Sequence, residues 1–268
     1  MSGPRRDFFG LLKPRWGVAT GLVLVVALWE AGHAAYGPVV LPSPGETLLA
    51  LWQMVRGGDA LPAVLQTLRG ALAGFLAAVV IGGALGLLAG LLEPLRAVLR
   101  PIATLMLGIP AVAWVVLALL WFGADLAVPF TVWVTCAPIV FAAAAEGARS
   151  LDPGLLRMAT AFRVPRTVLL ADLYLPHMLS HLFPALATAL ALALKVAVMT
   201  ELFSGAGGIG DGLATARAQV DTARAMAWIL LLVGLLLALE FLLLEPLRRH
   251  LEPWRGDKSP PRSGVSGS

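Results

Sequence analysis

The chain has 268 residues, of which 59% are hydrophobic and 13% are charged, and its mean hydropathy is +0.84. Soluble domains carry about 25% charged residues, so this composition excludes most soluble proteins and indicates a membrane protein. The formal net charge of +4 does not indicate a nucleic-acid partner, because the basic residues are spread between apolar stretches instead of forming one patch.

Long uncharged stretches predict an all-α polytopic membrane protein with six transmembrane helices. A helix needs about 20 mostly apolar residues to cross a bilayer. Four stretches, the predicted spans two to five, contain uncharged segments of 20 to 24 residues. The predicted sixth span is interrupted only by Glu240. In chain order, the predicted spans are 16–36, 70–92, 101–124, 126–145, 173–200 and 225–244.

The first span is the shortest, because only 14 uncharged residues separate Arg15 from Glu30. Basic residues before a short apolar run are also typical of a secretory signal peptide. We favour a retained span, because apolar residues continue to Tyr36 and no strong cleavage site follows. Retention and cleavage both remain open at this point.

The distribution of basic residues predicts that both termini are cytoplasmic. With six spans and an inner N-terminus, 15 of the 20 Lys and Arg residues fall in inner segments, as short cytoplasmic loops require. The predicted organisation is a cytoplasmic N-terminus (1–15), a first span (16–36), a periplasmic segment with an amphipathic helix (37–60), a five-helix transmembrane domain (61–249) and a cytoplasmic, disordered tail (250–268).

The inner loop between spans four and five begins with a helix-start signal. The Asp152 carboxylate is suited to cap backbone N–H groups, and Pro153 fits the first helical position. Pro165 predicts the end of this helix, because the residue before a proline avoids helical geometry. The apolar face of the helix comprises Leu155, Leu156, Ala159 and Phe162.

This loop resembles that of the membrane subunits of ATP-binding-cassette (ABC) importers. Their pattern is E-A-A, three residues, G, nine residues, I, one residue and L-P. Ala159 and Leu175-Pro176 keep the family identities, whereas Arg163 replaces the family glycine. The complete pattern falls on Arg157, Met158, Ala159, Arg163, Leu173, Leu175 and Pro176.

Other segments resemble the branch of this family that serves nitrate, taurine, alkanesulfonates and related small anions. These segments are Leu41-Pro-Ser-Pro, Leu120-Trp-Phe-Gly, Ser150-Leu-Asp-Pro, Glu201, Gly208-Ile-Gly and Leu251-Glu-Pro-Trp. The resemblance covers about residues 16–255 and implies the type I ABC importer transmembrane fold.

The resemblance implies that residues 153–162 form a coupling helix, which docks in a groove of a cytoplasmic ABC ATPase. The ATPase dimer binds ATP and Mg²⁺, so this chain itself is expected to hold no cofactor and to be no enzyme. The other implied partners are a periplasmic solute-binding protein and a second permease copy, in a homodimer or a heterodimer. The predicted ATPase-coupling residues are Asp152, Pro153, Leu156, Arg157, Met158, Ala159, Phe162, Arg163, Arg166, Leu175 and Pro176.

Arg163 is the largest departure from the family pattern. A glycine there suits a helix end with positive φ, and an arginine in the same conformation costs about 1 kcal/mol. The sequence therefore predicts either a turn rebuilt by Pro165 or a different ATPase groove.

Lys195 within span five and Glu201 directly after it are candidates for the translocation pathway. Placing a charge near the bilayer centre costs about 2.5 to 3.5 kcal/mol, so such a residue usually faces a partner or a wet path. We predict that Lys195 contacts an anion or pairs with Glu240 or Glu30. Glu201 is expected to act as a gate or an interhelical hydrogen-bond residue, or to reach the membrane interface.

The remaining motifs favour transport over catalysis. Gly205, Gly207 and Gly210 match G-x-G-x-x-G, but they follow a membrane span and not a strand, so we interpret them as an outer loop. The chain contains no P-loop, no catalytic motif of known hydrolases and no convincing metal-ligand set.

The predicted function is therefore the permease of a bacterial inner-membrane ABC importer for a small anionic solute. Nitrate, a sulfonate, taurine, bicarbonate and a pyrimidine precursor remain open as the solute. The alternative is a gradient-driven secondary transporter or channel, although such folds often show internal repeats, and none is found here.

Overall fold

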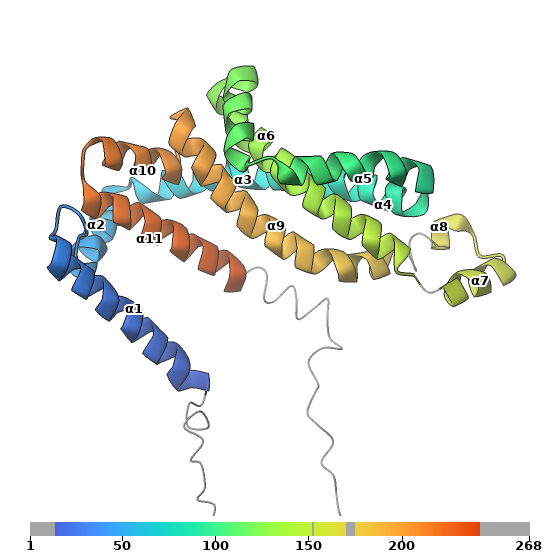
Figure 1. The fold of residues 1–268 in the computed structure, drawn as a ribbon, viewed down its shortest axis with the longest axis horizontal. Coiled ribbons are helices and arrows are strands. Elements are labelled where there is room, and N and C mark those ends of the chain that lie inside the picture. The colour runs from blue at the N-terminus through green and yellow to red at the C-terminus, as the bar shows by residue number, and fades with distance from the viewer. Residues whose placement is uncertain (1–13, 152, 170–174, 242–268) are drawn as a thin grey trace, which may run out of the picture.

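The computed structural model describes residues 14–151, 153–169 and 175–241, and these residues form helices joined by short turns. Several long helices share the long axis of the molecule, with α2 and α10 at one end and α7 and α8 at the other (Figure 1). We call these the α10 end and the α7 end. The helices are α1 (Pro14–Tyr36), α2 (Pro44–Gly57), α3 (Ala60–Ala77), η2 (Ala78–Gly82), α4 (Gly83–Leu91), α5 (Glu93–Gly108), α6 (Ala111–Arg149), α7 (Pro153–Ala161), α8 (Arg166–Val168), α9 (Leu175–Ser204), α10 (Ile209–Ala218) and α11 (Thr222–Leu239).

Four helical segments among the described residues are long and apolar enough to cross a membrane. They are Ala60–Leu91, Ala111–Arg149, Leu182–Ser204 and Thr222–Leu239, and a shorter apolar helix covers Thr20–Tyr36. The prediction of an all-helical, multi-pass membrane protein is therefore confirmed for the described part of the chain. The count of six spans is not confirmed.

The predicted third span differs most from the structure. The uncharged stretch 101–124 is not one straight helix, because α5 ends at Gly108 and Pro110 precedes the first turn of α6. A second break follows at Gly123, whose φ of 67° and ψ of −168° are not helical. The lack of charged residues shows that this stretch is apolar, but it does not indicate where the helix breaks, which is before Pro110 and at Gly123.

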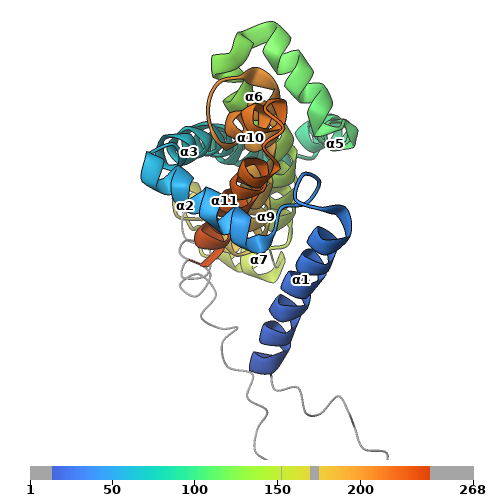
Figure 2. The same ribbon diagram turned by 90° about the vertical axis from the view of Figure 1, so that its left-hand side faces the viewer.

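The α2 helix was predicted as an amphipathic helix after the first span, and the structure contains it. Ser43 caps the helix in a capping box, in which Ser43 Oγ accepts from the Glu46 backbone N–H and Glu46 Oε2 accepts from the Ser43 backbone N–H. The bond from the Ser43 backbone lowers the pKa of Glu46 below its usual value. Trp29 of α1 donates to the Pro42 carbonyl oxygen at 2.9 Å, which ties α1 to the start of α2. The rest of α1 diverges from the other helices (Figure 2).

The centre of the bundle is formed by α6 and α9, with α3 and α4 packed against α6. Glycines recur along the α3–α4 helix at four-residue spacing, a pattern that favours close helix packing. The structure shows such packing at Gly86, where a Cβ atom would lie 2.5 Å from the Phe141 carbonyl oxygen and 2.7 Å from Ala144 Cβ. α4 therefore approaches the backbone of α6 too closely for any side chain at this position.

We expect Gly86→Ala to destabilise the bundle by about 1 to 3 kcal/mol, because α4 and α6 must separate to accommodate the methyl group. The measurement is the unfolding midpoint of the detergent-solubilised chain. Gly83→Ala is the matched control, since a Cβ there makes only an ordinary contact, 3.9 Å from Val140 Cγ1. Equal midpoints for the two variants would contradict the proposed close packing.

Candidate functional site

A buried carboxylate joins three helices at the α10 end. Glu201 lies in the last turn of α9 and is 1% exposed. Its Oε2 accepts hydrogen bonds from Thr67 Oγ1 of α3 at 2.8 Å and from the Gly210 backbone N–H of α10 at 3.0 Å. Thr67 Oγ1 also accepts from the Ile209 backbone N–H at 2.9 Å. We call these four residues the Glu201 cluster.

Two glycines make this arrangement possible. Gly208 has a φ of 95°, and a Cβ there would overlap the Glu201 carboxylate. A Cβ at Gly210 would overlap the Val198 carbonyl oxygen and lie 2.6 Å from Glu201 Cβ. The glycine-rich segment therefore lets α10 pack directly on α9, and its glycines serve a helix contact. The interpretation of the motif as a loop holds for Gly205 and Gly207, whereas Gly210 lies in the first turn of α10.

A cavity of 430 Å³ adjoins the Glu201 cluster. Glu201 lines it together with Arg69 and Gln66 of α3 and Asp125 of α6. In the described part of the chain, Glu201 Oε1 is buried and accepts no hydrogen bond.

Lys195 lies on a different face of α9 from Glu201, because six residues advance a helix by about 240°. Its side chain is exposed and lines a cavity of 570 Å³ with Thr188 of α9 and Glu240, which follows α11. The salt bridges of the described residues do not join Lys195 to Glu240 or Glu30. Lys195 thus shares a cavity with one predicted partner, and its anion contact stays a prediction.

The loop helix lies at the α7 end, opposite the Glu201 cluster (Figure 1). α7 begins at Pro153, as predicted, and ends at Ala161, one residue before the predicted end. Met158 is 54% exposed and Phe162 is 77% exposed, so two large apolar side chains are accessible on this short segment. The Arg157 side chain is exposed as well.

Arg163 adopts the backbone conformation that the family glycine suits. Its φ is 51°, and the Val164 backbone N–H donates to the Ala159 carbonyl oxygen at 3.0 Å to close the helix end. The structure therefore keeps the left-handed turn and places an arginine in it. Arg166 begins α8, and Leu175 and Pro176 begin α9. The side chains of these three residues and those of Pro153 and Leu156 lie outside the description, as does the whole of Asp152.

The predicted site residues therefore separate into two groups at opposite ends of the bundle. The described residues among those predicted to contact an ATPase lie at the α7 end, whereas Glu201 lies at the α10 end and Lys195 on the helix between them. Sequence reasoning missed Thr67, Gln66 and Arg69 of α3 and Asp125 of α6. The available signal was Thr67, a polar residue within an apolar helix only two positions before Arg69.

These features define an all-helical, multi-pass membrane protein with an exposed loop helix at one end and a buried polar contact at the other. Residues 60–256 match the family described as "Binding-protein-dependent transport system inner membrane component". The chain belongs to this family. The predicted resemblance to permeases of ABC importers is thereby confirmed, and the family places the chain in a membrane transport system.

Curated relatives extend over most of the chain. The riboflavin transport system permease protein RibX of Chloroflexus aurantiacus is 32% identical over 213 residues, which cover 78% of this chain and 79% of RibX. The taurine transport system permease protein TauC of Escherichia coli K12 is 27% identical over 261 residues, 92% of this chain and 94% of TauC. The bicarbonate transport system permease protein CmpB of Synechococcus elongatus is 28% identical over 215 residues, 77% of each chain.

A solved structure shows the same fold. A chain of the MetNI methionine ABC transporter, in an inward-facing conformation, matches with a TM-score of 0.63 and 20% sequence identity. The match covers 75% of this chain and 96% of the MetNI chain. Over the matched part, the arrangement of helices is therefore shared with a chain of an ABC transporter.

Proposed function

We propose that this chain forms the translocation path of an ABC importer for a small anionic solute in the bacterial inner membrane. Two copies enclose the path, a periplasmic binding protein delivers the solute, and a cytoplasmic ATPase dimer binds ATP and Mg²⁺. The chain spans the membrane six times, retains its first helix and has both termini in the cytoplasm. Residues 101–124 form the third span in two segments.

The observation that carries the proposal is the exposed helix α7 in the loop between α6 and α9. The apolar side chains of Met158 in α7 and of Phe162 directly after it are accessible. The same loop also carries Arg157 and Arg163. Exposed apolar groups on a short helix suit docking into a hydrophobic groove of a partner. The basic residues favour a cytoplasmic position for this end of the molecule.

At the opposite, periplasmic end, Glu201 is proposed to act as a gate residue, and the other residues of the Glu201 cluster hold its carboxylate in place. Its hydrogen bonds hold α10 against α3 and α9, next to the cavity with Arg69 and Asp125. A movement of α7 then reaches this end through α9, which runs from Leu175 near α7 to the Glu201 cluster.

An anionic solute is supported by Lys195 in the larger cavity and by the names of two relatives. TauC is named for taurine, which carries a sulfonate, and CmpB for bicarbonate, whereas RibX is named for riboflavin. A binding protein makes most of the choice among such solutes, so the permease requires only a path of suitable charge.

The test is transport by purified, reconstituted protein. The tagged chain is purified from its native membrane, a co-purifying P-loop ATPase is identified, and the complex is placed in liposomes with the binding protein. We expect uptake of one solute from a panel of taurine, an alkanesulfonate, nitrate and bicarbonate, and only with Mg²⁺ and ATP, whereas uptake of riboflavin, which is neutral at pH 7, would contradict an anionic solute. Uptake by the chain alone, driven by an ion gradient, would contradict the proposal and support a secondary transporter.

A further inference from the structure

A basic cavity lies between α5 and α6 at the α7 end, separate from the Glu201 cluster. Its volume is 360 Å³, and three arginines line it: Arg96 and Arg100 of α5 and Arg149 of α6. The other charged residue in its lining is Glu146. The cavity therefore presents an excess of positive charge.

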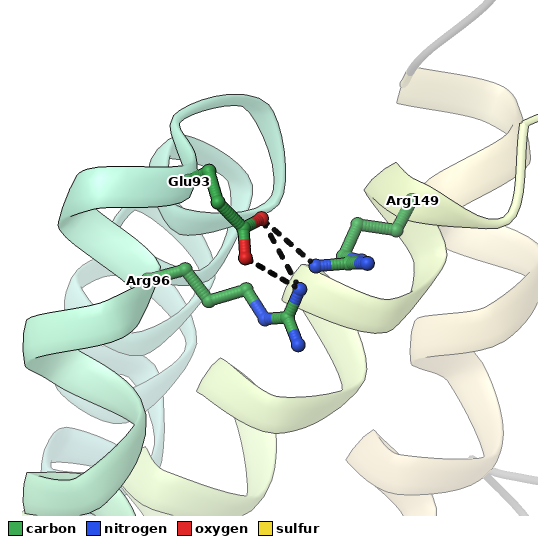
Figure 3. Close-up of polar contacts among 3 residues, drawn as sticks. All are labelled: Glu93, Arg96 and Arg149. Carbon is green, nitrogen blue, oxygen red and sulfur yellow. Dashed lines mark hydrogen bonds and ion pairs between the residues drawn. The ribbon is translucent and has the colours of Figure 1, made fainter.

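Glu93 holds two of these arginines together (Figure 3). Arg96 Nη1 lies 3.3 Å from Glu93 Oε2, and Arg149 Nη1 lies 3.1 Å from the same oxygen. The Arg96 side chain is only 20% exposed and that of Arg149 is 39% exposed, although Glu93 itself is 75% exposed. The Glu93 carboxylate thus holds the guanidinium groups of Arg96 on α5 and Arg149 on α6 next to each other.

The three guanidinium groups retain hydrogen-bonding capacity for a further anion. Each guanidinium has five N–H donors, and the bonds to Glu93 use Nη1 alone on Arg96 and on Arg149. Arg100 lies one helical turn from Arg96 on the exposed surface and forms no salt bridge among the described residues. Planar guanidinium groups match the oxygens of a phosphate, to which they often bind bidentately.

An apolar cleft of 220 Å³ lies beside the basic cavity. The two share Ala103 of α5 and Phe141 of α6, and the cleft is lined by apolar side chains of α5 and α6 and of the helix formed by η2 and α4. Ile102 of the cleft and the nearby Leu105 and Val98 are exposed on α5. A ligand that fills both spaces needs an anionic group next to an apolar chain.

We propose that these adjoining spaces bind an anionic phospholipid, with its phosphate at Arg96, Arg100 and Arg149 and an acyl chain along the cleft at Ile102 and Phe141. Basic pockets between membrane helices favour anionic headgroups, because the guanidinium groups directly contact the negatively charged phosphate. A free phosphate ion shares the headgroup chemistry but makes no use of the apolar cleft. The proposal requires only that the chain lies in a membrane, and it is independent of the solute and of ATP.

The experiment compares lipid binding by the full-length chain and its variants in detergent, using native mass spectrometry. The probes are phosphatidylglycerol, the zwitterionic phosphatidylcholine and inorganic phosphate. We expect phosphatidylglycerol to bind more tightly than phosphatidylcholine, and Arg100→Gln to weaken its binding about tenfold through the loss of one charge-assisted contact. Arg100→Lys keeps the charge and is expected to retain most of the binding.

Arg217→Gln is the matched control, because it removes the same charge from an exposed position on α10, at the other end of the molecule. Its binding of phosphatidylglycerol is expected to equal that of the unmodified chain. Equal binding by the Arg100→Gln and Arg217→Gln variants would overturn the proposal. Retention of inorganic phosphate that phosphatidylglycerol does not displace would also overturn it, by indicating a site for free anions.

Discussion

Replacing both Met158 and Phe162 by aspartate is expected to abolish ATP-driven uptake while leaving the chain folded in the membrane. Both side chains are largely exposed, at 54% and 77%, so they contribute little to the packing of this chain. Burying a Met or Phe side chain against a partner stabilises the contact by about 1.5 to 3 kcal/mol. Loss of both contacts should therefore reduce the binding free energy of the ATPase by about 3 kcal/mol or more. This loss weakens binding at least about a hundredfold.

The measurement is the dissociation constant of the permease and its ATPase, together with uptake by reconstituted vesicles. The control variant is Val220→Asp, which introduces one aspartate, half the added charge, at an exposed position at the α10 end. Val220 is 71% exposed and has a φ of 58°, a conformation that aspartate tolerates better than valine. Unchanged ATPase binding in the Met158 and Phe162 double variant would remove α7 from the coupling interface.

Replacing Glu201 by alanine is expected to reduce transport at least tenfold by freeing α10 from α3 and α9. The change leaves the Gly210 backbone N–H and the Thr67 hydroxyl without their acceptor in a buried setting, at a cost of about 1 to 3 kcal/mol each. Glu201→Gln keeps one carbonyl oxygen able to accept both bonds and should have a smaller effect. The measurements are the rate of uptake and the unfolding midpoint of the detergent-solubilised chain.

A second change tests the same contact without altering a charge. Gly210→Ala places a methyl group against the Val198 carbonyl oxygen, which belongs to the α9 backbone and cannot move away alone. We expect a loss comparable to that of Glu201→Ala. Gly234→Ala is the matched control, because a Cβ at this position of α11 has no neighbour within 4 Å. If Glu201→Ala and Gly210→Ala both behaved like Gly234→Ala, the Glu201 cluster would have no part in gating.

Features set by nearby residues could be predicted from the sequence. The loop helix begins at Pro153, and the amphipathic helix α2 lies within the predicted segment 37–60. Arg163 was identified as the residue in the glycine position, and it has the positive φ of that position. Each of these features depends on capping, on proline or on φ preferences, which act over a few residues of chain.

The sequence by itself determined that the protein is helical and lies in a membrane, because its apolar composition indicates both. Short motifs in the sequence determined its family. Only the tertiary structure brought Glu201 to Thr67, which lies 134 residues away, and Glu93 to Arg149, which lies 56 residues away. It also located the break at Gly123, within a stretch that is apolar throughout. Hydrophobicity selects which segments enter the membrane, whereas contacts between helices depend on the close approach that small residues allow, and no single segment contains that information.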